Sequence, residues 1–233
     1  MNTLLKRLFA VALAAAWSTT ASAVPLLFSN VGDDGQTTVF RAGLGGIVGL
    51  SQLGSVVIAD SNSGTGGSNG VFSGFDLDFV FLDLDGNYAT TGDRVFGSSF
   101  AFTTGAIRLP TTPGLDEPTL LRPGPTIGSS AANTIDPVRA TLNVRDGFFP
   151  GGFNTDNVSG WLTLGDAGLL AVEFGAAIVL TGNEALFIGE VGTSPGELVS
   201  ASVTASENRI PEPGTLVLAG LGLLSLAGRR RRT

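Results

Sequence analysis

A two-residue alternation of apolar and polar side chains constrains the fold of this chain more than any other feature of its sequence. Residues 139–145 (RATLNVR) and 199–206 (VSASVTAS) alternate throughout, and Phe or Leu stands at every odd position of residues 75–81, with Asp76 and Asp78 between them. This alternation is typical of a β-strand with one buried face. No stretch from 24 to 209 keeps the helical period of about 3.6 residues over three turns. The sequence therefore predicts strands in place of helices.

Short apolar runs separated by turn residues extend this pattern along the chain. Gly, Asn and Asp favour tight turns, and they interrupt the runs at 33–35, 85–87, 165–168 and 181–183. Further segments expected to be strands are 26–28, 37–40, 56–59, 100–102, 161–164, 169–174, 176–180 and 185–188. About nine or ten short strands joined in this way predict an all-β fold, an antiparallel β-sandwich or jelly roll.

The chain contains neither cysteine nor histidine. Without cysteine it can form no disulfide, thiol nucleophile or zinc–thiolate site. Without histidine it lacks the commonest general base at neutral pH and the commonest transition-metal ligand. A Ser-His-Asp or Cys-His hydrolase is therefore excluded.

Acidic side chains dominate the segment 24–209, which we take as the folded body. Seven Arg and no Lys oppose 19 Asp and Glu there, a formal charge of −12. A surface of this charge repels nucleic acid and anionic lipid, and it attracts cations. We therefore expect no nucleic-acid partner.

Residues 1–23 have the layout of a secretory signal peptide. Lys6 and Arg7 form a basic start, residues 8–17 are apolar, and the segment ends in Ala-Ser-Ala, the small residues that signal peptidase accepts. The apolar stretch is too short to span a bilayer, which takes about 20 residues. We expect cleavage before Val24 and export of the remainder.

Residues 210–233 form a second candidate targeting segment, at the C-terminal end of the chain. Pro211, Glu212 and Pro213 end any preceding regular structure, because proline continues neither a helix nor a strand ladder. The apolar run 215–228 (TLVLAGLGLLSLAG) follows. As a helix it would be about 21 Å long, shorter than the hydrocarbon core of about 30 Å. We expect a short transmembrane helix that thins the bilayer or leans on its flanks.

The chain closes with a basic cluster formed by Arg229, Arg230, Arg231 and Arg232. Basic residues beside a transmembrane segment stay on the cytoplasmic side. The helix therefore tethers the body on the outer side of the membrane.

This order of a Pro-Glu-Pro motif, an apolar helix and a terminal basic cluster resembles the PEP-CTERM sorting signal, which is paired with an N-terminal signal peptide. The resemblance covers residues 210–233 only. It implies two processing partners, signal peptidase and exosortase, a membrane-embedded transpeptidase-like enzyme that cuts near the motif. It also implies a Gram-negative bacterium that makes extracellular polysaccharide. The protein would be tethered at the inner membrane before processing, then placed at the cell surface or in the biofilm matrix, where polysaccharide is a candidate partner.

The candidate site of the body is a group of acidic residues around one turn. Asp83, Asp85 and Asn87 place oxygen side chains at every second residue, Asp93 follows ten residues after Asp83, and Asp76 and Asp78 precede them. Ca²⁺ takes about six to eight hard oxygen ligands and tolerates irregular loops. These residues are either a calcium site, which would be the one cofactor of the chain, or a solvated acidic strand face that runs into a turn.

The pattern around this turn departs from an EF-hand loop. Tyr88 stands where the sharp-turn glycine belongs, and Arg94 where the bidentate glutamate belongs. A calcium site here would therefore be of another kind.

Three hypotheses for the function follow from the sequence. The first is a non-enzymatic surface or matrix protein with no catalytic residues, sorted by an exosortase-like system. The second is a carbohydrate-binding or calcium-dependent adhesion module. The third is a glycosidase that uses two carboxylates, since that chemistry requires only an Asp or Glu pair at a separation of roughly 5–10 Å.

Overall fold

The computed structural model describes residues 24–33, 35–47, 50–61, 70–108, 122–123, 126–148, 160–192 and 201–206. All of them belong to one compact unit, Ala23–Glu207. The predicted signal peptide (1–23) and sorting tail (210–233) lie outside the described residues. Within the described ranges, no helix is long and apolar enough to cross a membrane.

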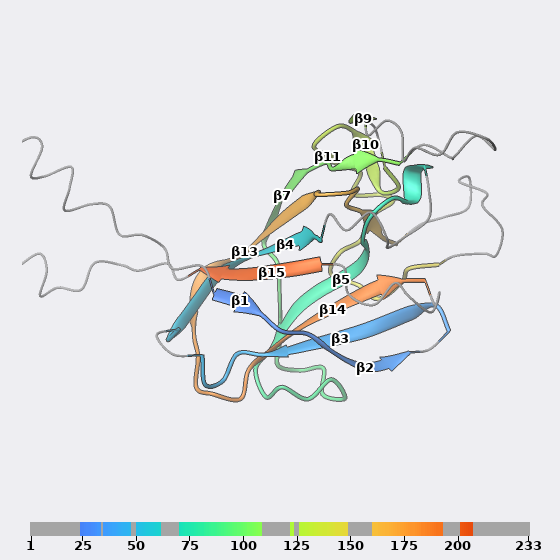
Figure 1. Cartoon of the computed structure of the whole chain (residues 1–233). Helices are drawn as coiled ribbons and strands as arrows, with labels where there is room; N and C mark the ends of the chain where they lie inside the picture. Colours follow the sequence, from blue (N-terminus) through green and yellow to red (C-terminus); the bar gives the residue numbers. More distant parts are fainter. Residues whose placement is uncertain are drawn as a thin grey trace, which may run out of the picture. The chain divides into compact units, whose positions relative to one another are not determined.

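Five antiparallel strands form the first sheet, in the order β1-β15-β4-β13-β7 (Figure 1). Their bounds are β1 Val24–Leu26, β4 Gln52–Asp60, β7 Ser99–Thr103, β13 Leu169–Val179 and β15 Ala201–Ser206. The central strand β4 buries Val56 and Ile58 while Ser55 and Val57 are partly exposed. This is the alternation expected of a strand with one face toward a core.

The second sheet has the order β12-β5-β14-β3-β2, and β6 pairs with β5 beside this path. Its bounds are β2 Ser29–Asp33, β3 Thr37–Gly43, β5 Asp76–Asp83, β6 Arg94–Phe96, β12 Leu162–Thr163 and β14 Ala185–Val191. Strand β14 is buried along its whole length. Its sequence, ALFIGEV, is accordingly a nearly continuous apolar run, as expected of a strand covered on both faces.

The remaining described elements are short. They are the 3-10 helix η1 Gly70–Phe72 and the strand pairs β8 Ala106–Ile107 with β9 Arg122–Pro123 and β10 Ser129–Ala131 with β11 Thr134–Ile135. The described residues contain no α-helix, and all their paired strands are antiparallel. The all-β, antiparallel prediction is therefore confirmed.

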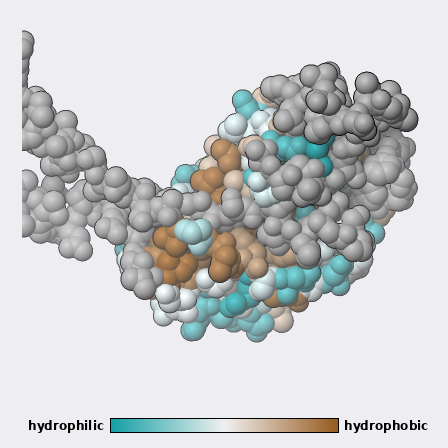
Figure 2. All heavy atoms as spheres, viewed as in Figure 1, coloured by the Kyte–Doolittle hydropathy of each residue, from teal (hydrophilic) through white to brown (hydrophobic). Residues whose placement is uncertain are grey.

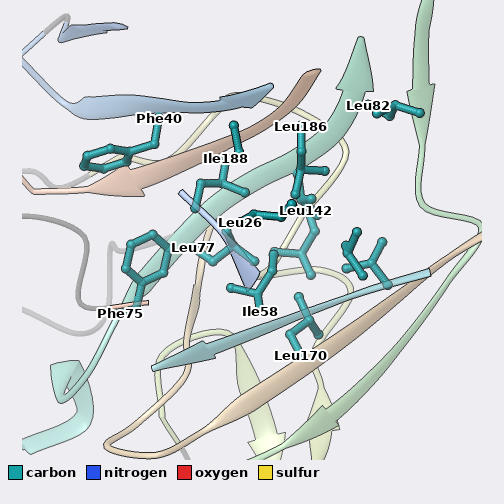
Figure 3. Close-up of a cluster of buried hydrophobic side chains, with 14 of the residues drawn as sticks. Leu26, Phe40, Ile58, Phe75, Leu77, Leu82, Leu142, Leu170, Leu186 and Ile188 are labelled. Atoms are coloured by element: carbon teal, nitrogen blue, oxygen red, sulfur yellow. The ribbon is translucent and has the colours of Figure 1, made fainter. Parts of the chain in front are cut away.

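Side chains from both sheets meet in one apolar core (Figure 3). Ile58 and Leu170 come from the first sheet, and Phe40, Leu186 and Ile188 come from the second. None of the five is more than 1% exposed. Full burial of such a side chain stabilises a fold by about 1.5–3 kcal/mol, so this core supplies the cohesion that disulfides would otherwise provide.

The prediction that residues 75–81 present all their odd positions to one face is wrong. Opposite β14, Ile188 pairs with Val80 whereas Glu190 pairs with Leu77, so two steps along β14 correspond to three along β5. This extra residue is a β-bulge, which reverses the faces beyond it. Leu77 and Val80 therefore share the main core, and Phe79 points to the opposite face of the sheet.

The prediction of a strand at 139–145 is also wrong. Residues 137–139 and 142–144 form turns, and no strand is present there. Ala140 and Leu142 nevertheless belong to the main core. Their spacing comes from a turn that inserts two apolar side chains, so it mimics the period of a strand.

The segments 169–174 and 176–180, expected to be separate, form the single strand β13 apart from Leu180. Gly175 lies between them with φ of 79°, a conformation that glycine adopts readily. The pairing of β13 with β4 shifts register between Glu173 and Ile178. A bulge at the glycine thus lets one strand bend where the sequence suggested a break.

Candidate metal centre

The hairpin formed by β5 and β6 carries the acidic residues predicted from the sequence. Asp83 ends β5 and pairs with Arg94, the first residue of β6. The connecting loop contains Asp85 and Asp93, and one carboxylate oxygen of each of the three aspartates lies within 4.8 Å of the other two. Figure 2 shows hydrophilic residues along the lower edge of the view, where Figure 1 draws the loop that follows β5.

Backbone amides hold these carboxylates in place. The N–H of Asn87 donates to Asp83 Oδ1 at 3.0 Å and to Asp85 Oδ1 at 2.8 Å. The N–H of Asp85 donates to Asp93 Oδ2 at 3.1 Å, and the Thr90 hydroxyl donates to Asp85 at 3.0 Å. The turn thus brings together Asp83 and Asp93, which are ten positions apart in the sequence.

Two oxygens of the cluster are buried without a hydrogen-bond partner among the described residues, Asp83 Oδ2 and Asp93 Oδ1. Asp83 is 0% exposed, whereas Asp85 is exposed to solvent and Asp93 is half-buried. An unpartnered buried polar atom costs about 1–3 kcal/mol, and more when it is charged. The cluster therefore lacks a positive partner at its buried side and is open to solvent at Asp85.

The pKa values of the two neighbouring acids move in opposite directions. Burial raises the pKa of Asp83, and the adjacent carboxyl of Asp85, close enough to share a proton, raises it further. The Asn87 amide hydrogen bond is the main cause of the lowered pKa of Asp85. In the absence of a cation, protons thus gather first on the buried member of the pair.

The loop is fixed at Gly86 by the rest of the second sheet. Arg41, from β3, donates through Nε to the Gly86 carbonyl at 3.2 Å. Gly86 has φ of 71°, and a Cβ placed there would lie 2.3 Å from the carbonyl oxygen of Asn183. Only glycine fits this approach, so the loop follows a defined path beside the cluster.

The other predicted site residues have different roles. The side chain of Asn87 accepts a hydrogen bond from the Ala89 N–H at 3.1 Å, so it stabilises the turn. Asp76 accepts from the Thr163 hydroxyl. Asp78 accepts from Thr37. The structure thus brings the three predicted aspartates together, and calcium at this place stays a prediction.

An aromatic layer beside the loop was missed by the sequence analysis. The Tyr88 ring lies 5.4 Å from that of Phe187 and 6.1 Å from that of Phe81, centre to centre. The Arg94 guanidinium lies 4.4 Å from the centre of the Phe81 ring and donates to the Tyr88 carbonyl at 2.6 Å. Arg145 donates to the Tyr88 hydroxyl at 3.0 Å. Phe81 and Tyr88 lie close to the acidic turn in the sequence, which is a weak indication that aromatic rings would adjoin it. Phe187 and Arg145 are distant in the sequence and come close to the loop only in the folded chain.

Comparison with known proteins identifies the C-terminal segment. Residues 209–232 match the model of the PEP-CTERM protein-sorting motif, which confirms the resemblance seen in the sequence. The motif indicates an extracellular protein that is sorted by an exosortase-like enzyme. Neither the curated proteins nor the solved structures include a match to this chain.

Proposed function

We propose that this chain is a non-enzymatic protein of the cell surface or extracellular matrix, a β-sandwich delivered by an exosortase-like system. The observation that carries the proposal is the sorting motif at 209–232, joined to a body of two antiparallel sheets that share one core. On this proposal, signal peptidase releases the N-terminal segment, the C-terminal helix holds the chain at the inner membrane, and processing near the motif then frees the body.

The environment of the buried acids supports a structural role. Asp78 accepts hydrogen bonds from Thr37 and the Gly147 amide, and Glu184 accepts from the Thr181 hydroxyl and the Gly182 amide. Asp166 forms an ion pair with Arg108 at 3.1 Å. Asp78 and Asp166 thus join backbone segments that are distant in the sequence, and Glu184 stabilises its own turn, so all three have structural partners.

Sorting is tested with two glutamates that differ only in their position relative to the motif. Glu212 lies inside the matched segment, and Glu207 lies just before it. We expect Glu212→Ala, expressed in the native host, to leave an unprocessed chain in the membrane fraction on immunoblots. Glu207→Ala should reach the surface like the wild type. Identical surface delivery of both variants, with the tail removed from both, would contradict the proposal.

Absence of enzymatic activity is tested against the rival glycosidase hypothesis. The purified protein is incubated with the exopolysaccharide of its own host, and the polymer length is followed by size-exclusion chromatography. We expect no change. Shortening that disappears in a variant of one Asp or Glu would establish a glycosidase instead, while leaving the sorting route intact.

A further inference from the structure

We propose that Asp83, Asp85 and Asp93 bind one Ca²⁺, which fastens the loop between β5 and β6 to the end of the second sheet. The observation behind this goes beyond the sequence pattern. Asp83 is completely buried, and its Oδ2, like Asp93 Oδ1, has no hydrogen-bond donor among the described residues. One oxygen of each of the three carboxylates lies within 4.8 Å of the others, close enough to share one ion.

The neighbouring arginines do not neutralise the cluster. Arg41 is directed to the Gly86 carbonyl, and Arg94 to the Tyr88 carbonyl and the Phe81 ring. Among the described residues, no arginine lies within the 4.0 Å of an ion pair with any of the three aspartates. The two arginines beside the loop are thus bound to other partners, and the negative charge of the three carboxylates remains uncompensated.

Either a proton or a metal ion can compensate that charge. A proton shared by Asp83 and Asp85 would leave Asp93 Oδ1 without a partner, since its other oxygen already accepts from the Asp85 amide. A cation bound by the three carboxylates would compensate the charge of all of them at once. It also removes the repulsion among three carboxylates, which at close range costs more in a buried site than in water.

The donor set selects the kind of cation. All three side chains offer hard carboxylate oxygens, and the chain has no histidine or cysteine to favour zinc or copper. Ca²⁺ accepts an irregular oxygen shell and fills it with water where the protein supplies fewer than about six ligands. Mg²⁺ demands a stricter octahedron and loses its water reluctantly. The exposed Asp85 gives the ion a path from solvent.

The test is thermal unfolding of the full-length chain in a mild non-ionic detergent, after removal of metal with EDTA and dialysis. CaCl₂ is titrated to about 10 mM, with NaCl of equal ionic strength and MgCl₂ as separate arms. At a concentration near 100 times the dissociation constant we expect the melting temperature to rise by roughly 5–10 °C. NaCl should leave it unchanged, and MgCl₂ should need a concentration at least tenfold higher for an equal shift.

Matched variants locate the ion. Asp85→Asn, at the exposed ligand, should lose most of the calcium shift and still fold. Asp33→Asn is the control, since Asp33 also accepts a hydrogen bond from the amide two residues on, at 2.6 Å from Gly35, but lies outside the cluster. It should keep the full shift.

Asp83→Asn should change the melting temperature differently without and with calcium. The substitution removes a buried charge that has no counter-charge, so without calcium the melting temperature of the variant should equal or exceed that of the wild type. With calcium it should show no rise. A wild-type shift below about 1 °C at 10 mM calcium would overturn the proposal, as would a full shift retained in Asp85→Asn or Asp83→Asn. None of these outcomes depends on the sorting route.

Discussion

Thr37 donates a hydrogen bond of 2.6 Å from its hydroxyl to the buried carboxylate of Asp78. The two residues lie in β3 and β5, which flank β14, and Gly189 of β14 leaves room beside Thr37 and beside Phe79, the neighbour of Asp78. A Cβ on Gly189 would lie 2.9 Å from Thr37 Cγ2 and 2.4 Å from the Phe79 ring. The bond therefore crosses a whole strand. Asp78 also accepts from the Gly147 amide at 2.8 Å, which holds the segment beyond Arg145 against the sheet.

We predict that Thr37→Val lowers the free energy of unfolding at pH 7 by about 1–3 kcal/mol, because it deprives a buried carboxylate of a donor. Burial already raises the pKa of Asp78, and the Thr37 bond opposes that rise. The loss should therefore be greatest where Asp78 is ionised and should shrink as the pH falls and the carboxyl protonates. Urea denaturation across pH measures it. Thr38→Val is the control, since the contacts of that hydroxyl are 3.4 Å long.

Glu184 should give a pH dependence of the same direction, although its pKa is shifted the other way. Burial would raise its pKa, but hydrogen bonds from the Thr181 hydroxyl and amide and from the Gly182 amide outweigh burial and lower the pKa to about 2. Its contribution is therefore complete above the ordinary value of 4.5 and is lost as the pH falls toward 2. We expect Glu184→Gln to cost about 1–3 kcal/mol at pH 7. The difference from wild type should shrink in denaturation series below pH 4.5; a difference constant with pH would refute this account.

Arg94 should not be replaceable by lysine. Its guanidinium stacks on the Phe81 ring at 4.4 Å while it donates to the Tyr88 carbonyl. Lysine offers a compact charge without that planar surface. We expect Arg94→Lys to cost about 1 kcal/mol, a decrease in melting temperature of roughly 2–4 °C. Arg139→Lys, at a side chain 51% exposed, is the control and should change little. Equal melting temperatures for both variants would show that the stacking contributes nothing.

Gly74 should tolerate no side chain. It has φ of 83°, and a Cβ there would lie 2.5 Å from the carbonyl carbon of Gly165. Both the conformation and the contact with backbone penalise alanine, so we expect Gly74→Ala to cost about 1–3 kcal/mol in chemical denaturation. Gly32→Ala should stay within about 0.5 kcal/mol, because its Cβ would meet nothing within 4 Å.

The sequence predicts strands well wherever one face is buried and the register is unbroken. The local sequence pattern alone was enough to predict the strands at β4, from its alternating apolar positions, and at β14, from its apolar run. It fails at Phe79 because a bulge is fixed by pairing with β14, which the local pattern does not contain. It fails at Ala140 and Leu142 because a turn also buries alternate residues when it packs on a core.

Part of the candidate site could likewise be predicted from the sequence, and part could not. Asp83, Asp85 and Asp93 could be found from the sequence because one hairpin brings them together. The use of the Asn87 side chain in its own turn depends on backbone geometry that the pattern does not encode. The contact of Arg145 with Tyr88 joins residues 57 positions apart, so only the folded chain shows it.

Intact-mass measurement of the protein recovered from the outer surface of its host tests the central claim most directly. We predict a mass that begins at Val24 and lacks the residues beyond the cleavage near Pro211, and we predict that the C-terminal segment is retained when the host's exosortase-like enzyme is deleted. A surface protein that still spans Met1 to Thr233, or one whose C-terminal trimming is unchanged in the deletion strain, would contradict it.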